Sequence, residues 1–263
     1  MKKLLFVLAL ILVLALTLSS CVKDEGGNGG SATAENAQGL DFYLKDDGTY
    51  AVAIGNAKYL SNIEIPETYL GKAVTEIAYN GFEQAQNLKS ITIPDSVTAI
   101  GEYAFSGCSG LTSVVIPDSV TYIGDSAFSC CSDLTEIVIP VSVTTIGKHA
   151  FSSCSGLTSV VIPDSVTYIG EWAFSWCFRL TSVVIGDSVT IIGEYAFRDC
   201  SSLTSVVIGD SVTIIGEYAF NCCELKNVYY TGSEEEWEAI AIVSEGNFYL
   251  TNATIHYNYV PEE

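Results

Sequence analysis

A repeat of 23 residues constrains this chain more than any other feature. Between residues 82 and 223, Phe, Leu, Gly and Cys each recur at that interval. A unit this short cannot bury its apolar edge alone, so successive copies must stack into a solenoid with one continuous core. The Phe series is Phe82, Phe105, Phe128, Phe151, Phe174, Phe197 and Phe220, and the Cys series is Cys108, Cys131, Cys154, Cys177, Cys200 and Cys223.

One copy, Leu157 to Arg179, shows the expected local structure. The β-branched run Ser159–Ile162 favours a short strand, and Pro163–Ser165 has the residues of a turn. Gly170 permits a bend, and Glu171–Cys177 is expected to form a short helical turn with its apolar side chains buried. Because the copies stack strand on strand, the strands should form a parallel sheet.

The repeat LTSVVIPDSVTYIGEWAFSWC resembles the BspA-like subclass of leucine-rich repeats, over about residues 61–225. Ser165 and its equivalents stand where the general leucine-rich consensus has Asn or Cys, so the regular Asn ladder is absent. The resemblance implies an α/β solenoid: a right-handed stack of 23-residue coils, with a parallel β-sheet on one face, short helical turns on the other, and a cap at each end. It also implies a bacterial surface protein associated with adhesion to host matrix proteins, such as fibronectin and fibrinogen, or to other cells.

The N-terminus is typical of an export signal. Lys2 and Lys3 precede the apolar run Leu4–Leu16, which is too short to span a bilayer and fits a signal peptide. The following Leu18–Cys21 segment resembles a lipoprotein signal, which implies cleavage after residue 20 and lipidation of Cys21. The alternative is an ordinary signal peptide with an incidental cysteine. We therefore expect export and a lipid anchor on the outside of the bacterial cell envelope.

The rest of the chain divides into four expected parts. Residues 21–39 are rich in Gly, Ser and Asn and should form a flexible tether. Residues 40–60 contain a hairpin pattern that would cap the solenoid of residues 61–227. Residues 228–263 should form a C-terminal cap. In that cap, Ser233 and Glu236 form a capping-box pattern before a short helix, and Trp237 should cover the open core.

Eight cysteines remain after lipidation of Cys21. An even number in an exported chain suggests disulfides. However, parallel side chains in one repeated rotamer do not present the dihedral angle that a disulfide needs, and free Cys suits a core. Buried free thiols are therefore expected for the Cys series, with one or more bridges, or a metal site, as the alternatives.

Two rows of side chains are candidate binding surfaces. The first lies on the outward side of the predicted strands and is a candidate protein-binding face, unless it reflects β-propensity alone. The second is a row of rings two residues before each Phe, which could bind a glycan or anchor a partner, unless the rings are partly buried. The first row is Val115, Val138, Val161, Val184 and Val207 with Ser159 and Ser182, and the second includes Tyr103, Trp172, Tyr195 and Tyr218.

The charge and the few histidines exclude several functions. The formal net charge of −20, with 11 basic residues, argues against nucleic-acid binding. His149 and His256 are the two histidines, and no nucleophile, phosphate-binding loop or metal motif accompanies them. We therefore predict no enzyme activity, no cofactor and no metal. The predicted function is a membrane-anchored, cell-surface protein-binding module, an adhesin. The alternatives are a glycan-binding protein that uses the ring row, and a structural or self-associating surface element.

Overall fold

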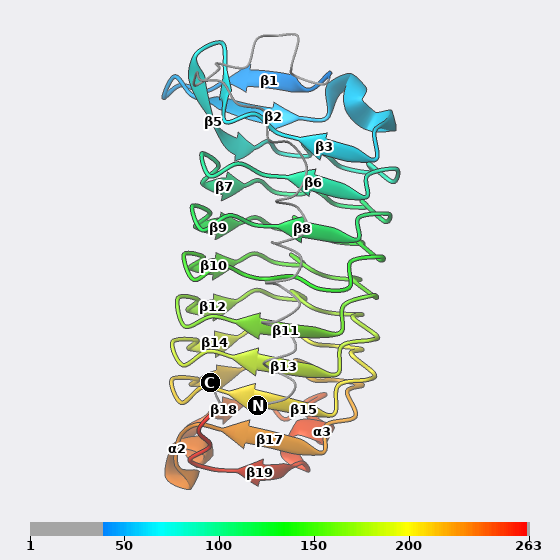
Figure 1. Ribbon diagram of the computed structural model, residues 1–263. Helices are drawn as coiled ribbons and strands as arrows, with labels where there is room; N and C mark the ends of the chain where they lie inside the picture. Colours follow the sequence, from blue (N-terminus) through cyan, green and yellow to red (C-terminus); the bar gives the residue numbers. More distant parts are fainter. Residues whose placement is uncertain (1–38, 262–263) are drawn as a thin grey trace. The chain divides into compact units, whose positions relative to one another are not determined.

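The computed structural model describes residues 39–261, and the solenoid unit within that range ends at Tyr259. Successive coils lie one above another in about nine turns of about 23 residues (Figure 1). The described residues include two short α-helices and one 3-10 helix, η3 (Gly55–Tyr59). The predicted leucine-rich-repeat stack, with a parallel sheet along one face, is confirmed.

The strands predicted from the L-x-x-V-x-I pattern line one side of the coils, which we call the strand face. In each of these strands the first Val and the final Ile point into the core, and the residue between them points outward. The register is unshifted from coil to coil: Ser159 pairs with Ser182, and Ser182 with Ser205. Two parallel sheets result: β3 (Asn62–Glu64), β6 (Ser90–Thr92) and β8 (Ser113–Val115); and β11 (Ser159–Ile162), β13 (Ser182–Ile185), β15 (Ser205–Ile208), β17 (Asn227–Tyr230) and β19 (Thr254–His256).

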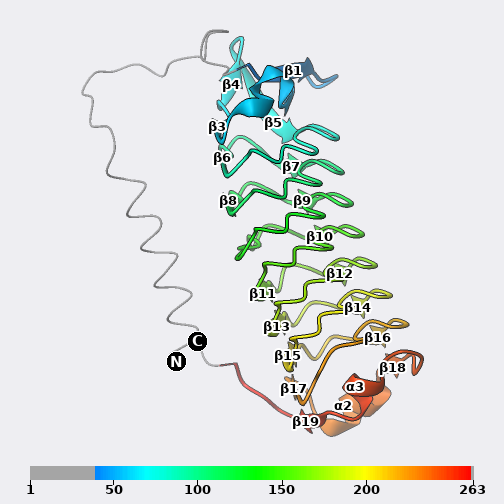
Figure 2. The same ribbon diagram turned by 90° about the vertical axis from the view of Figure 1, so that its right-hand side faces the viewer.

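A second parallel ladder, which the sequence analysis did not predict, follows the turn after each long strand. Its strands have two residues each, of which the second is a buried Ile in the regular coils. Figure 2 shows this ladder on the opposite side of the coils from the strand face. Its members are β7 (Ala99–Ile100), β9 (Tyr122–Ile123), β10 (Thr145–Ile146), β12 (Tyr168–Ile169), β14 (Ile191–Ile192), β16 (Ile214–Ile215) and β18 (Ala241–Ile242).

The segment expected to be a short helical turn is a series of tight turns, which we call the turn face. Along this segment, every second backbone amide donates to a carbonyl of the next coil. The amides between them donate to the carbonyl three residues earlier in the same coil. Left-handed backbone at two positions of each coil, such as Tyr103 (φ 56°) and Gly107 (φ 72°), accompanies this alternation. An α-helix would keep these bonds within one coil, whereas the turns also tie neighbouring coils together. In one coil the amides of Tyr103, Phe105 and Gly107 reach the next coil at 2.7–2.8 Å, and those of Ala104, Ser106 and Cys108 turn back at 3.0–3.2 Å.

The recurring glycine is required by the close approach of the coils. A Cβ added to Gly170 would lie 2.5 Å from the carbonyl oxygen of Gly147, and one on Gly193 would lie 2.7 Å from that of Ile169. Neither glycine has a positive φ. The sequence analysis assigned Gly170 to a bend, but the structure shows that the missing side chain lets the coils stack.

The core is a set of stacked side-chain ladders. The seven Phe rings from Phe82 to Phe220 are fully buried. Neighbouring rings lie 5.0–5.4 Å apart, with interplanar angles of 1–15°. Leu, Ile, Val, Ala and Cys ladders fill the remaining core around this column. Each coil therefore buries its apolar groups against its two neighbours.

An antiparallel hairpin precedes the first coil. It consists of β1 (Asp41–Leu44) and β2 (Tyr50–Ala53), and β2 then pairs with β5 (Lys72–Ile77), which also carries β4 (Thr68–Tyr69) as an antiparallel partner. Gly48 has the left-handed backbone that the hairpin turn requires, with φ 82°. The hairpin thus lies at the N-terminal edge of the long sheet.

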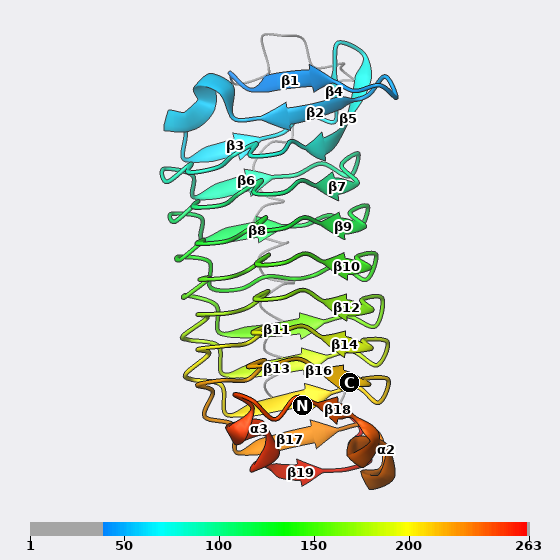
Figure 3. The same ribbon diagram turned by 180° about the vertical axis from the view of Figure 1, so that it is seen from behind.

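The other end of the unit carries α2 (Glu234–Ala239) and α3 (Phe248–Thr251) (Figure 3). The predicted capping box is confirmed: the Ser233 amide donates to the Glu236 carboxylate at 2.8 Å, and the Glu236 amide donates to the Ser233 hydroxyl at 3.3 Å. Trp237 is partly buried against the core, with its ring 5.2 Å from that of the fully buried Tyr230. The domain boundaries at residues 39, 60 and 227 stay predictions.

Buried Asn247 ends the hydrogen-bond pattern of the turn face. In the coil before the last, the amide of Phe197 donates to a backbone carbonyl of the next coil at 2.8 Å. The equivalent amide of Phe220 donates instead to the side-chain oxygen of Asn247 at 3.0 Å. The Asn247 amide group donates to the carbonyls of Gly216 and Val243 at 2.9 and 2.7 Å. The Asn247 side chain therefore supplies the acceptor that a backbone carbonyl of the next coil supplies elsewhere in the stack.

Within residues 39–261 no helix is both long and apolar enough to cross a membrane. The expected signal peptide, the tether up to residue 38 and the lipidated Cys21 lie outside the described residues.

Candidate functional site

The strand face presents a row of valines to solvent. Val115 is 66% exposed, Val138 54% and Val161 46%, whereas Val184 and Val207 are half-buried. Ser159 is half-buried and Ser182 exposed. The structure therefore brings the predicted row together on one face, and its apolar surface is most exposed in the N-terminal half.

The strand face is interrupted in the coil that holds Val138. No strand is assigned to residues 134–140, which lie between β8 and β11, although the second ladder continues through the same coil as β10. This coil departs from the repeat, with Glu136 where β8 and β11 begin with Ser113 and Ser159. Val138 keeps its outward position without belonging to a sheet.

The ring row runs along the turn face as a stack. Each of its residues has left-handed backbone, including His149 (φ 56°), Trp172 (φ 60°) and Tyr195 (φ 58°). Adjacent rings from His149 to Tyr218 are near parallel, with centroids 5.8, 4.0 and 5.1 Å apart in chain order. Tyr103 lies two coils away from His149, with Ser126 between them, and contacts Tyr79 edge-on at 6.0 Å.

This stacking decides which ring surfaces are free. Trp172 has rings from both neighbouring coils stacked on it, and so does Tyr195. The two rings at the 4.0 Å contact leave no space for a sugar between them. Trp172, Tyr195 and Tyr218 are half-buried, so each ring is partly covered by its neighbours and keeps part of its surface in contact with solvent. Glycan binding by this row stays a prediction.

Charged groups border the row. The Arg198 guanidinium carbon lies 5.4 Å from the Trp172 ring and 5.5 Å from the Tyr195 ring, and its Nε bonds Asp199 at 3.0 Å. The Tyr218 hydroxyl donates to Glu245 at 2.8 Å, and this bond raises the tyrosine pKa. Burial lowers the pKa of His149, although Asp125 and Glu171 act in the opposite direction. The sequence analysis missed Arg198, although it is one of two arginines in the chain.

The Cys series forms a ladder of free, buried thiols. All eight cysteines in the described residues are free, and the six of the series are fully buried. Each thiol of the series donates to a Phe carbonyl of the preceding coil, as Cys154 does to Phe128 at 3.1 Å and Cys177 to Phe151 at 3.3 Å. Burial raises the pKa of Cys108 to about 12, and it also raises the pKa of Cys131, Cys154 and Cys200 well above the usual thiol value. Thiols, not disulfides, thus occupy this part of the core.

We expect a thiol reagent to separate two groups of cysteines. In the folded protein at pH 8, maleimide should label the exposed Cys130 and Cys222 within minutes and leave the buried series unlabelled, because the thiolate is the reacting form. In urea all eight should react. Mass spectrometry of tryptic peptides assigns each label. Equal labelling of Cys154 and Cys130 in the folded protein would contradict the buried ladder.

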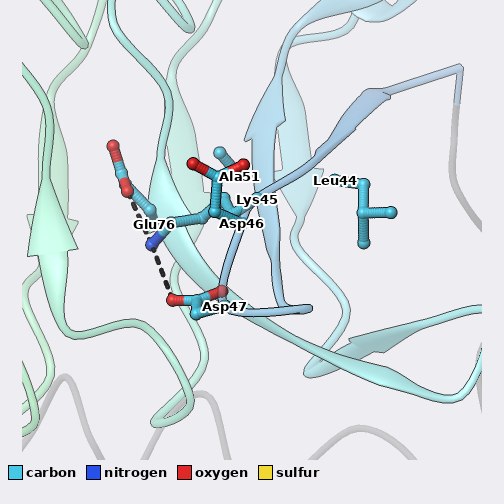
Figure 4. A pocket seen from close by; sticks show the side chains of 6 residues that line it. All are labelled: Leu44, Lys45, Asp46, Asp47, Ala51 and Glu76. Carbon is cyan, nitrogen blue, oxygen red and sulfur yellow. Dashed lines mark ion pairs between the residues drawn. The ribbon is translucent and has the colours of Figure 1, made fainter.

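A shallow pocket of about 510 Å³ lies beside the N-terminal hairpin (Figure 4). Lys45 reaches Glu76 at 2.9 Å and Asp47 at 3.6 Å across it, and the bond to Glu76 raises the lysine pKa. Leu44, Asp46 and Ala51 complete the lining. Lys45, Asp47 and Glu76 thus pair with one another, and no His, Ser or Cys side chain lines this pocket. The sequence analysis did not identify it.

Metal-binding groups are not brought together in the part of the chain that the structure describes. No three His, Cys, Asp or Glu side chains there could hold one metal ion. His149 stacks on Trp172, and His256 contacts Asn227 at 3.0 Å and stacks on Tyr229. The arrangement presents repeated rows of side chains on an ordered scaffold, which suits binding.

Such a stack of 23-residue coils, with parallel ladders and a capped end, defines a leucine-rich repeat solenoid. A family model described as the BspA type leucine-rich repeat region matches six copies, over residues 52–180 and 128–249. The chain therefore belongs to the BspA-type leucine-rich repeat family. Membership in this family points to an interaction role at the cell surface.

Solved structures of bacterial proteins share the fold. A leucine-rich repeat protein from T. pallidum, TpLRR, is 30% identical, with a TM-score of 0.67, over 74% of this chain and 89% of that one. A leucine-rich repeat protein from Bacteroides ovatus is 28% identical, with a TM-score of 0.54, over 72% of this chain and 57% of that one. No match was found among curated proteins.

Proposed function

We propose that this protein is an exported, lipid-anchored and non-catalytic module that binds a protein partner outside the cell through its strand face. Host matrix proteins are the partners that we propose, and Cys21 is the proposed anchor. The family supports a surface interaction role. The class of partner and the lipid anchor are proposals that go beyond this family role.

One observation carries the choice of the strand face. Val115, Val138 and Val161 expose about half or more of their side chains, at equivalent positions of three successive coils. Exposed apolar side chains in one row are costly in water and mark an interaction surface. The three valines recur at the 23-residue period on the same face of successive coils, so a partner can be contacted at several coils at once. Ser113 and Ser159 border Val115 and Val161 with small side chains, whereas Glu136 stands at the equivalent position beside Val138.

Placing Lys at Val115 and Val161 together should weaken binding to an immobilised matrix protein at least about tenfold, which corresponds to ~1.4 kcal/mol. The two charges would have to be desolvated in the interface. The melting temperature should change little, because both side chains are exposed in the free protein. Surface plasmon resonance against fibronectin and fibrinogen, with a glycan array in parallel, measures the effect.

Val141→Lys is the control for an added charge outside the row. Val141 is 75% exposed and lies in the turn that follows residues 134–140, outside the row. It should bind as the unsubstituted protein does. Equal losses in the control and the double variant would show that added charge alone matters, and would refute the strand-face site. Binding to glycans and to no matrix protein would favour the ring row instead.

A further inference from the structure

The ring stack of the turn face is interrupted at one coil, where Ser126 stands. Tyr103, Ser126 and His149 have the same left-handed backbone, with φ 56°, 55° and 56°. Their amides donate to the next coil in the same way, at 2.8, 2.7 and 2.9 Å. The scaffold of this coil is therefore unchanged, and only the ring is replaced by a hydroxymethyl group.

The spacing of the stack indicates what fits at this position. Rings in adjacent coils lie 4.0–5.8 Å apart. Tyr103 and His149 are separated by two coil steps, or about 10 Å at the usual strand spacing of ~4.8 Å. A planar group midway would lie about 5 Å from each ring, as the rings of the stack do from one another. Ser126 is buried at the base of this position, and Tyr103 is 38% exposed beside it.

The charge around Ser126 favours a cation. Glu102 and Asp125 directly precede Tyr103 and Ser126, and both carboxylates contribute to raising the pKa of the nearby Tyr122. Lys148, the nearest cation in sequence, bonds Glu171 through Nζ at 2.9 Å. The chain as a whole carries a formal charge of −20. Burial lowers the pKa of His149, which disfavours the charged imidazole that would repel a cation.

The molecule already contains an arginine on this row. Arg198 places its guanidinium within 5.5 Å of the Trp172 and Tyr195 rings and pairs it with Asp199. A guanidinium is planar and weakly hydrated, and stacks on aromatic faces while it donates to carboxylates, which an ammonium does less well. The groups at Ser126 offer both kinds of contact.

We propose that the position at Ser126 is a docking site for an arginine side chain of a basic protein partner. The guanidinium stacks between the Tyr103 and His149 rings and donates to the carboxylates of Glu102 and Asp125. Asp125 has one oxygen engaged by the Lys148 amide at 2.8 Å, which leaves the other for the ligand. This site lies on the turn face and does not depend on the strand-face proposal.

The test compares two peptides and one substitution in the full-length chain. A labelled nona-arginine peptide should bind at least about threefold more tightly than nona-lysine of equal charge, in fluorescence anisotropy at 150 mM salt. Ser126→Tyr supplies the ring that Tyr103, Tyr195 and Tyr218 supply in other coils, so the fold should persist with an unchanged or higher melting temperature. It should reduce nona-arginine binding to the nona-lysine level.

Glu102→Gln and Glu217→Gln remove the same charge at equivalent positions of the repeat. Glu102 lies beside the interruption of the ring stack, and Glu217 lies where the stack is complete. Glu102→Gln should weaken nona-arginine binding more than Glu217→Gln does. Equal affinity for the two peptides, or unchanged nona-arginine binding in Ser126→Tyr, would overturn the proposal. So would a neutral oligosaccharide that binds only while Ser126 is present. Matrix-protein binding of Ser126→Tyr reports separately on the strand face.

Discussion

Replacing Phe151 with Ala is expected to lower the free energy of unfolding by roughly 3–5 kcal/mol, the usual cost of removing a buried ring. The Phe151 ring is fully buried and stacks on Phe128 at 5.4 Å and on Phe174 at 5.1 Å. Each coil is stabilised by its neighbours, so the cavity weakens the coils on both sides as well as its own. Loss of cooperativity should therefore accompany the loss of stability.

Urea unfolding measures the size of this effect, and hydrogen exchange measures its spread. Amides near Phe128 and Phe174 should lose protection together with those near Phe151. Phe178→Ala is the control with the same chemical change, since Phe178 is 48% exposed, and it should cost less than about 1 kcal/mol. A Phe151→Ala protein as stable as the control would contradict the stacked core.

Asn247→Ala should have the second largest effect, a loss of roughly 2–4 kcal/mol from groups left without hydrogen bonds. The substitution removes the acceptor for the buried Phe220 amide and the donors to the carbonyls of Gly216 and Val243. Because these groups lie at the last coil, fraying should begin there and not in the middle of the stack.

Asn252→Ala is the matched control for the cap. Asn252 is exposed, and its amide donates to the Phe248 carbonyl at 2.8 Å. We expect a change below about 1 kcal/mol, because water can replace an exposed bond. Limited proteolysis followed by mass spectrometry should show early cleavage after residue 220 in Asn247→Ala alone. Equal proteolysis of both variants would argue against a special role for Asn247.

The period predicted the buried ladders correctly because burial repeats with the coil. Phe151, Leu157 and Cys154 recur at fixed intervals and are all fully buried. The turn face was harder to predict, since left-handed backbone is unusual for residues such as Tyr103 and Trp172. Hydrogen bonds between coils hold that backbone, and such bonds have no local sequence signal. The recurring glycine was predicted to permit a bend, whereas the structure shows that it is needed for the close approach of neighbouring coils.

The candidate surfaces were predictable as rows but not in detail. Alternation along the strands placed Val161 outward, yet it could not reveal that Val184 is half-buried. The ring row was predicted as a ridge, but only the structure shows that Trp172 and Tyr195 stack at 4.0 Å. Asn247 lies after the last copy of the 23-residue repeat and has no equivalent in it, so no pattern marks it.

The C-terminal cap makes this protein adjustable in length. The Asn247 side chain bonds backbone groups of the last coil, Phe220 N–H and Gly216 C=O, which every coil presents. These bonds therefore do not distinguish one coil from another, and the Tyr218–Glu245 hydrogen bond adds a contact that needs a Tyr in the last coil. Duplication or deletion of a whole 23-residue unit would move the two ends of the solenoid apart or together by ~4.8 Å and leave the Asn247 backbone bonds intact. A lineage could thus change the reach of its surface by unequal recombination, without redesigning either end.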